Sequence, residues 1–249
     1  MDGRRSQWVH SCFQTHFSSV FQLNMIKSKM QRNGRKFNID CKKCKRLSRF
    51  LKDIKLEYPD YHCAPVAPFG ADDARLLIVG LAPGMHGANA TGRPFTGDHA
   101  GLLLYSMLFE HGFSNQPLSE SSGDNLKLQD CRITNAVKCL PPANKPTGEE
   151  VGNCSDYLVD DIKKVPEGGV ILALGKIAHD AVIKALNLRL VDFKFNHGNL
   201  HLLEGRSLTL VDSYHCSRYN TQTNRLTTLM FSNVFKLVLT VFKGRTSDG

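Results

Sequence analysis

Four short strand-like runs that alternate with helical patterns constrain the fold of this 249-residue chain most strongly. The runs occupy residues 75–80, 131–138, 169–175 and 208–213. Helical patterns follow them at residues 101–110, from 146 onward, 176–186 and 224–242. Short runs rich in Ile, Leu and Val are typical of strands buried on both faces of a parallel sheet. The sequence therefore predicts an α/β fold, a three-layer α/β/α sandwich with a mostly parallel central sheet.

The ends of these four runs predict where a ligand binds. Gly80, Asn135, Gly175 and His215 fall at or just beyond the ends of the predicted strands. In open α/β sheets, ligands bind outside the carboxyl ends of the parallel strands. We therefore expect a binding pocket at this edge of the sheet.

The charge balance favours a polyanionic partner. The formal net charge is +9 and the pI is near 9.2. Lys and Arg that dock on phosphates release condensed counterions, which favours binding to nucleic acid. No apolar run reaches the roughly 18 residues that a membrane span needs, and no signal peptide is recognisable. These features predict a cytoplasmic protein.

Residues 1–36 differ in character from the rest of the chain. They are rich in Lys, Arg and Ser and poor in acidic residues, and they contain one short apolar patch. We interpret them as a basic, poorly ordered N-terminal arm, followed by a single domain over residues 37–249. A later start at Met25 or Met30 and a targeting peptide are alternatives.

Four of the eight cysteines have a spacing that indicates a metal site. Cys41 and Cys44 form a C-x-x-C pair, and Cys139 and Cys154 lie far downstream. A C-x-x-C pair is shared by zinc sites, redox dithiols and iron–sulfur centres. The long separation argues against a compact zinc finger. From the residues alone, an iron–sulfur cluster, a zinc ion and four ordinary thiols remain alternatives.

Three segments combine small residues with polar groups that can handle a proton. They are Gly80-Leu-Ala-Pro-Gly84, Gly92-Arg-Pro-Phe-Thr-Gly-Asp98 and the stretch that runs from Ser213 through His215 to Asn224. The glycines let a ligand approach the backbone closely. The polar groups are a carboxylate in the second segment and an imidazole in the third.

These segments, in this order and with the four cysteines, resemble the uracil-DNA glycosylase superfamily, specifically its family 5 of type B iron–sulfur enzymes. The resemblance runs from about Cys41 to about Phe242. It implies a DNA repair enzyme that flips uracil, and other deaminated bases, out of DNA. The enzyme would hydrolyse the N-glycosidic bond and leave an abasic site. The resemblance also implies a [4Fe-4S] cluster held by Cys41, Cys44, Cys139 and Cys154.

The resemblance assigns catalytic roles to Asp98, His215 and Asn144. The best-known branch of the superfamily has an acid where this chain has Ala82, so Asp98 would instead orient water or offset charge on the sugar. Asp98 also suits a helix N-cap, and the two roles are compatible. His215 would donate a hydrogen bond to the O2 atom of the departing base, and Asn144 would help to position water.

The resemblance also implies the residues that bind the substrate. Backbone N–H groups of the segment containing Gly80, Ala82 and Gly84 would bind the base carbonyls, and Phe95 would stack on the base. Family 5 members often have a small residue at the position of Asn135. The amide of Asn135 would narrow the range of bases that the enzyme excises toward uracil.

The contacts with DNA are expected from one loop. Its residues Ser217, Arg218, Tyr219 and Asn220 would enter the duplex and touch phosphate, although Tyr219 stands where Gln is usual in the family. Three further basic residues are candidate phosphate contacts, namely Arg93, Lys138 and Lys145.

Two rival functions follow from the same residues. A non-catalytic iron–sulfur or zinc protein that binds damaged nucleic acid is disfavoured because Asp98, Asn144 and His215 are all present. A metal-dependent hydrolase of small molecules is disfavoured because four thiolate ligands leave no open coordination position. No Lys is placed to act as a Schiff-base nucleophile, so we expect a monofunctional glycosylase. We also expect it to be a monomer.

Overall fold

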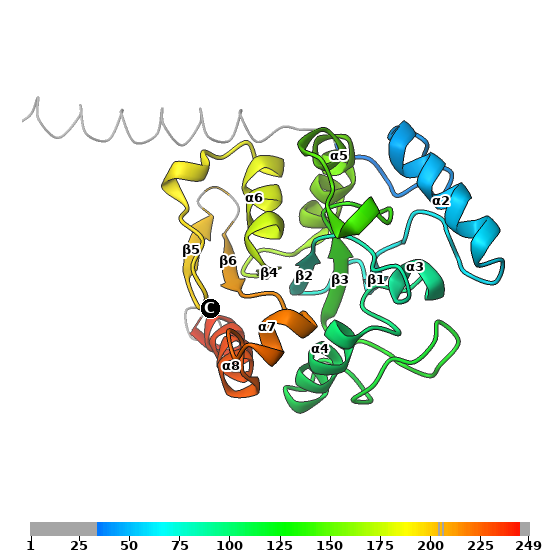
Figure 1. Ribbon diagram of the computed structural model, residues 1–249. Coiled ribbons are helices and arrows are strands. Elements are labelled where there is room, and N and C mark those ends of the chain that lie inside the picture. Colours follow the sequence, from blue (N-terminus) through cyan, green and yellow to red (C-terminus); the bar gives the residue numbers. More distant parts are fainter. Residues whose placement is uncertain (1–33, 204, 206, 245–249) are drawn as a thin grey trace, which may run out of the picture. The chain divides into compact units, whose positions relative to one another are not determined.

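The computed structural model describes residues 34–203, 205 and 207–244, which belong to the compact unit Asn33–Gly249. Residues 1–33 of the expected N-terminal arm lie outside the described residues. One six-stranded sheet lies between two layers of helices (Figure 1). This arrangement confirms the predicted three-layer α/β/α sandwich.

The sheet has four parallel inner strands and one antiparallel strand at each edge. Its order is β1-β3-β2-β4-β6-β5. The inner strands are parallel to their neighbours, whereas β1 and β5 pair antiparallel with β3 and β6. The bounds of the strands are β1 Phe69–Gly70, β2 Leu76–Gly80, β3 Cys131–Asn135, β4 Val170–Leu174, β5 Leu200–Leu203 and β6 Leu208–Ser213. The predicted second strand therefore ends at Asn135 and not at residue 138.

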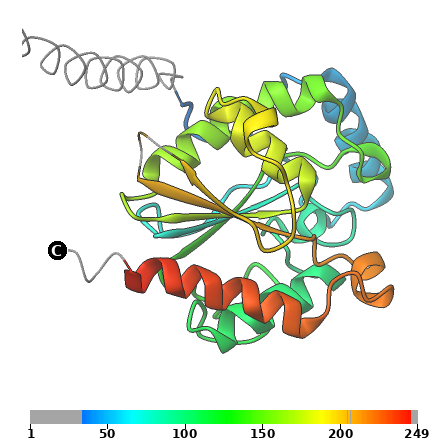
Figure 2. The same ribbon diagram turned by 90° about the vertical axis from the view of Figure 1, so that its left-hand side faces the viewer.

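Helices cover both faces of the sheet because its inner strands are buried on both sides (Figure 2). Helices α4 (His99–Glu110) and α8 (Thr228–Gly244) cover one face. Helices α5 (Gly148–Lys164) and α6 (Lys176–Ala185) cover the other. Helix α5 begins at the predicted place, where Thr147 and Glu150 form a capping box.

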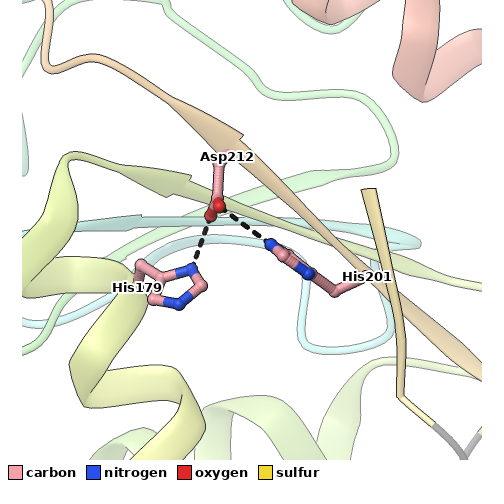
Figure 3. Close-up of side chains that lie close together, drawn as sticks. All are labelled: His179, His201 and Asp212. Atoms are coloured by element: carbon pink, nitrogen blue, oxygen red, sulfur yellow. Dashed lines mark hydrogen bonds and ion pairs between the residues drawn. The ribbon is translucent and has the colours of Figure 1, made fainter. Parts of the chain in front are cut away.

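A buried polar network joins the edge strand β5 to the body of the domain. His179 on α6 and His201 on β5 both hydrogen-bond the carboxylate of Asp212 on β6 (Figure 3). The Nδ1–Oδ1 distance from His179 is 2.7 Å, and the Nε2–Oδ2 distance from His201 is 3.0 Å. The network connects three elements around one carboxylate that is inaccessible to solvent.

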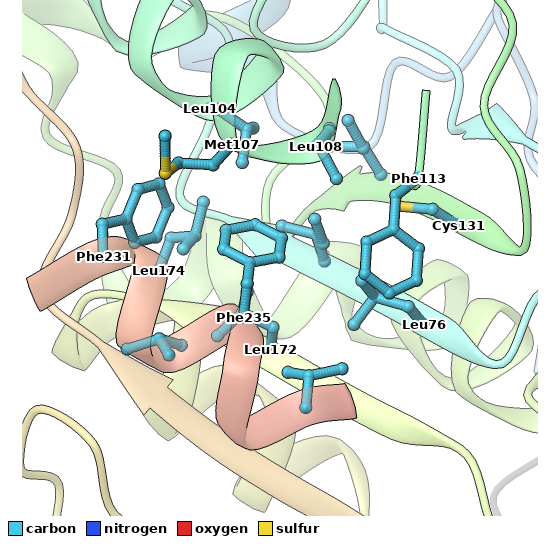
Figure 4. Packing of buried hydrophobic residues seen from close by; sticks show 14 of the residues in the cluster. Leu76, Leu104, Met107, Leu108, Phe113, Cys131, Leu172, Leu174, Phe231 and Phe235 are labelled. Atoms are coloured by element: carbon cyan, nitrogen blue, oxygen red, sulfur yellow. The ribbon is translucent and has the colours of Figure 1, made fainter. Parts of the chain in front are cut away.

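The main hydrophobic core lies between the sheet and the α4–α8 layer (Figure 4). Alternate strand residues such as Leu76 and Leu172 meet Leu104 on α4 and Phe231 and Phe235 on α8. The intervening strand residues point to the opposite face, because side chains alternate along a strand. Both layers therefore hold the strand ends at fixed positions.

Five further helical elements among the described residues were not predicted. They are α2 (Lys45–Glu57), α3 (Ala88–Thr91), η1 (Pro142–Asn144), η2 (Leu190–Asp192) and α7 (Arg218–Gln222). Helix α2 buries Leu47, Leu51 and Ile54 and exposes a strongly basic face. No helix in the described part of the chain has the length and apolar character of a membrane span.

Candidate active site

A pocket of about 590 Å³ opens at the carboxyl ends of β2, β3 and β6. The loop after β2 forms one wall, and the segment after β6 forms another. The pocket brings together most of the predicted catalytic and substrate-binding residues, namely Ala82, Gly84, Phe95, Asp98, Asn135, Asn144 and His215. Residues that are up to 133 positions apart in the chain, from Ala82 to His215, thus share one cavity.

Asp98 serves both as a helix cap and as a wall of the pocket. Its Oδ1 atom accepts a hydrogen bond of 2.9 Å from the backbone N–H of Gly101 at the start of α4. Its Oδ2 atom faces the glycine-rich loop, where a Cβ atom on Gly87 would lie only 2.6 Å away. Burial raises the pKa of Asp98, and the backbone N–H groups of Gly101 and Ala100 oppose this rise only in part.

His215 lies two residues beyond β6 and lines the pocket. Its ring is 6.0 Å from the ring of Phe95, centroid to centroid, at an interplanar angle of 29°. Burial lowers the pKa of His215 to about 4, so the imidazole is neutral at pH 7. Neither of its ring nitrogens bonds a residue in the described ranges, which leaves its N–H group available to a ligand.

Gly80, Phe95 and Asn135 form the inner end of the pocket. A Cβ atom on Gly80 would lie 2.4 Å from Oδ1 of Asn135 and 2.7 Å from Cζ of Phe95, so only glycine fits there. Phe95 has a φ of +55°, a strained value for a side chain of its size. Oδ1 of Asn135 is buried without a hydrogen-bond partner among the described residues. An unpartnered buried acceptor costs about 1–3 kcal/mol, which a ligand N–H would recover.

Asn144 reaches the pocket from the one-turn helix η1. Both Ala143 and Asn144 have positive φ values, of 52° and 55°. Two consecutive non-glycine residues in this region are costly, and such strain is concentrated at functional sites. Lys145, a predicted phosphate contact, follows directly and is exposed.

The predicted DNA-binding loop has two kinds of residue. Ser217 caps helix α7 by accepting a hydrogen bond from the N–H of Asn220, and the Asn220 amide donates to the carbonyl oxygen of His215 at 2.8 Å. These two residues hold the loop in place. Arg218 and Tyr219 are exposed, and Arg218 lines the pocket. These two side chains are placed to meet a large ligand.

The four cysteines predicted to bind metal gather in one apolar cluster. Cys139 and Cys154 are buried, and the half-buried Cys41 and Cys44 pack against the same cluster. The amide of Asn153 lies 3.5 Å from Sγ of Cys44, as a donor. Burial raises the thiol pKa values of Cys139 and Cys154, and the neighbouring thiols add to this effect on both. Without a cation, Cys139 and Cys154 are thus electrostatically unfavourable as thiolates, which suits a metal-binding set.

Ala82 and Met85 belong both to this cysteine-containing cluster and to the pocket wall. The cysteine centre and the pocket are therefore packed against the same side chains. The sequence analysis did not foresee this connection.

Two of the predicted phosphate contacts are wrong. Arg93 is buried, and its guanidinium binds the carboxylate of Asp124 at 2.5 Å. Lys138 is buried as well, and its Nζ atom lies 2.9 Å from Oδ2 of Asp161. Both cations are neutralised inside the protein and cannot reach DNA.

Two groups of functional interest were missed by the sequence analysis. One is the contact between Tyr61 and His86 at the pocket, where Tyr61 Oη lies 2.9 Å from Nδ1 of His86. The other is the network of His179, His201 and Asp212, whose ligand atoms all lie within 4.8 Å of one another. Neither group has a local sequence signal, because its members come from separate segments.

Comparisons with known proteins identify the family of this chain. The family model of the uracil DNA glycosylase superfamily matches residues 67–239. A type-5 uracil-DNA glycosylase of Thermus thermophilus is 43% identical over 199 residues, which cover 78% of this chain and 90% of the relative. One of Pyrobaculum aerophilum is 40% identical over 202 residues, covering 80% and 87%. A type-4 uracil-DNA glycosylase of Archaeoglobus fulgidus is 31% identical over 180 residues, covering 71% and 76%.

Proposed function

The chain belongs to the uracil-DNA glycosylase superfamily, and we propose that it is a monofunctional uracil-DNA glycosylase. It removes uracil from DNA by hydrolysis of the N-glycosidic bond and leaves an abasic site. The observation that carries this function is the single pocket in which Asp98, Asn144 and His215 surround Phe95 and Asn135. The exposed donors at its rim and the net charge of +9 suit DNA as the substrate.

Recognition of the extruded base uses the inner end of the pocket. Phe95 offers an aromatic face, and base–aromatic stacking contributes about 1–3 kcal/mol. The buried Oδ1 atom of Asn135 is an acceptor, and the uracil ring has a matching N–H donor between its two carbonyl groups. A hydrogen-bonding site rejects bases that leave its buried polar atom unpaired. Uracil pairs with this acceptor, whereas cytosine, whose ring N3 atom is itself an acceptor, leaves it unpaired.

His215 stabilises the negative charge that develops on the departing base. Because the imidazole is neutral, it acts as a hydrogen-bond donor to the base oxygen and not as a general acid. One preorganised donor of this kind contributes roughly 3–4 kcal/mol to the transition state. The Asn220 amide fixes the backbone of His215 and so maintains this geometry.

Asp98 acts on the sugar side of the N-glycosidic bond. Its Oδ1 atom is engaged by the N-terminus of α4, and Oδ2 remains directed toward the loop that lines the pocket. The free oxygen orients the attacking water or offsets positive charge on the sugar. Asn144 assists in holding the water. No lysine lines the pocket among the described residues, in keeping with hydrolysis without strand cleavage.

Cys41, Cys44, Cys139 and Cys154 would hold a [4Fe-4S] cluster. Such a cluster, when bound, links the segment before α2 to the segment after β3 and the helix α5. The four cysteines gather at one apolar cluster although they come from segments far apart in the chain. Four thiolates are the ligand set of a [4Fe-4S] cluster.

The proposed activity is tested with oligonucleotides that contain one uracil, as single strands and opposite G or A. The purified protein should release free uracil and leave strands that break only after alkali. Strand breakage without alkali would contradict the monofunctional mechanism. No product from uracil, hypoxanthine or xanthine would exclude the enzyme and favour a protein that binds damaged nucleic acid. Sedimentation of the protein alone and with DNA tests the expected monomer.

A further inference from the structure

An aromatic cluster made of Tyr58, Tyr61 and His86 adjoins the pocket. The rings of Tyr58 and Tyr61 are stacked, with centroids 4.6 Å apart and an interplanar angle of 17°. The imidazole of His86 stands edge-on to both, with centroid distances of 5.6 Å and 6.0 Å. The tyrosines follow helix α2, whereas His86 belongs to the loop after β2 and lines the pocket. The aromatic cluster at the rim of the pocket is thus formed by two segments that are separate in the sequence.

Backbone hydrogen bonds hold these two segments together. The N–H of His62 donates to the carbonyl oxygen of Ala90 at 3.0 Å, and the N–H of Cys63 donates to that of Asn89 at 3.1 Å. The tyrosine segment therefore cannot move independently of the loop that bears His86. The His86 side chain is held in place while it remains exposed to solvent.

The hydroxyl of Tyr61 determines which nitrogen of His86 can face a ligand. The phenol oxygen lies 2.9 Å from Nδ1. When the phenol donates to Nδ1, the imidazole proton resides on Nε2. Nε2 has no partner among residues 34–203, 205 and 207–244. With the phenol as the donor in this contact, His86 presents an N–H group on Nε2 at the mouth of the pocket.

The position of this donor indicates what it binds. Phe95 and Asn135, at the inner end, are buried, whereas His86 is exposed. An extruded base enters the pocket, and its sugar and phosphates remain at the rim. Half to two-thirds of protein–DNA hydrogen bonds go to phosphate and sugar oxygens. We propose that His86, oriented by Tyr61, donates from Nε2 to a phosphate oxygen of the strand that carries the extruded base, an inference that rests on the proposed function.

Two matched pairs of variants test this contact. His86→Gln keeps an amide N–H near the position of Nε2, whereas His86→Asn reaches only the position of Nδ1. Tyr61→Phe removes the hydroxyl bonded to His86. Tyr58→Phe removes a hydroxyl from the same cluster that interacts with Glu57 instead. Binding is measured with a duplex that carries an abasic site, and single-turnover excision is measured with a uracil duplex at saturating protein.

We expect His86→Asn to raise Kd about tenfold, the loss of one hydrogen bond to a charged oxygen. His86→Gln should stay within about threefold of the wild type, Tyr61→Phe should raise Kd about threefold, and Tyr58→Phe should have no effect. Excision at saturation should change less than about threefold throughout, because the contact positions the strand and does not touch the reacting atoms.

The salt dependence gives a second readout. A neutral donor releases no counterion, so His86→Asn should leave the slope of log Kd against log salt unchanged. Arg218→Ala removes a charged donor from the same rim and should reduce the slope by about 0.9.

The contact is overturned if His86→Asn binds like the wild type, if His86→Gln is as weak as His86→Asn, or if the two tyrosine variants behave alike. Uracil release by the wild type is followed in the same samples. Its absence would refute the proposed function. Its presence together with unchanged binding by His86→Asn would refute the contact alone.

Discussion

The protonation states of single residues determine which chemistry the pocket supports. Burial lowers the pKa of His215 to about 4, whereas burial raises the pKa of Asp98 from its ordinary value. At neutral pH the histidine is therefore neutral, and burial makes the aspartate easier to protonate than an exposed carboxyl group. A neutral donor on the base side and a carboxylate on the sugar side match the charges that develop when the N-glycosidic bond breaks.

These states predict the pH dependence of single-turnover excision. Activity should fall in acid, as Asp98 and His215 gain protons, and no loss from His215 should occur between about pH 6 and pH 8.5. An imidazolium acid would behave in the opposite way, because activity would fall as the pH rose through its pKa. The account is contradicted by an alkaline loss in this range that disappears in His215→Gln.

The lack of a side chain at Gly80 allows close packing at the inner end of the pocket. Its missing side chain makes room for Asn135 and Phe95, which would otherwise lie 2.4 Å and 2.7 Å from a Cβ atom. Gly80→Ala should therefore displace the stacking ring and reduce excision by about 100-fold, as small misplacements of reacting groups do. Gly123→Ala is the control, because nothing lies within 4 Å of its added Cβ atom. Equal activity of the two variants would refute the packing argument.

At this scale, the residues predicted from motifs reached the pocket, because each motif occupies one contiguous segment of the chain. Asp98, Phe95 and His215 are examples. The prediction failed for Arg93 and Lys138, whose environment depends on Asp124 and Asp161 from other segments. Long-range ion pairs leave no local pattern in a sequence.

At the level of elements, the network in Figure 3 connects α6, β5 and β6 through one charged pair. His179 Nδ1 faces the carboxylate of Asp212, and its Nε2 faces the carbonyl oxygen of Phe193 at 2.9 Å. Both partners are acceptors, so both nitrogens carry protons and His179 is an imidazolium. Burial alone lowers the pKa of His179, but the hydrogen bond and charge of Asp212 outweigh it and raise the pKa.

The pair of His179 and Asp212 predicts that the free energy of unfolding falls in alkaline solution. Because the folded-state pKa of His179 lies above the unfolded value of about 6.5, its contribution is complete below about pH 6.5 and is lost as the pH rises through the folded pKa. Asp212→Asn should cost about 3–5 kcal/mol by leaving a buried cation unpaired. Thermal unfolding of the wild type and of Asp212→Asn is measured from below about pH 6.5 into the alkaline range.

His179→Gln should remove the alkaline decline. His111→Gln provides a control of opposite sign, because burial lowers the pKa of His111 and its contribution grows as the pH rises. The assignment fails if His179→Gln unfolds with the same pH dependence as the wild type.

Strands made of apolar residues throughout were predictable, whereas a helix with few buried apolar residues was not. Strands β2 and β4 consist of buried apolar residues throughout, so composition alone identifies them. Helix α2 has only three buried residues among many Lys and Arg residues. Its position depends on packing against Val137, Leu140 and Tyr157, which the sequence order does not disclose.

In the domain as a whole, the cysteine centre and the pocket share one apolar cluster. Ala82 and Met85 contact this cluster and also line the pocket. Loss of the metal centre should therefore disturb the pocket as well as the segment before α2. Through these shared side chains, the proposed metal centre would support the geometry of the pocket without touching the substrate.

The metal centre is tested by Cys154→Ser. This variant should lose absorbance near about 400 nm and bound iron, and it should unfold at a lower temperature than the wild type. Cys63→Ser is the matched control, because Cys63 packs against the same cluster but lies outside the ligand set. Bound zinc in place of iron in anaerobically purified wild type would contradict the proposed cluster.

The most direct test of the account is single-turnover release of uracil by Asp98→Asn and His215→Ala beside the wild type. Each variant should bind uracil-containing DNA within about threefold of the wild type yet excise at least about 100-fold more slowly, since each removes an interaction made in the transition state. Rapid excision by both variants would contradict the assignment of the pocket chemistry to these two residues.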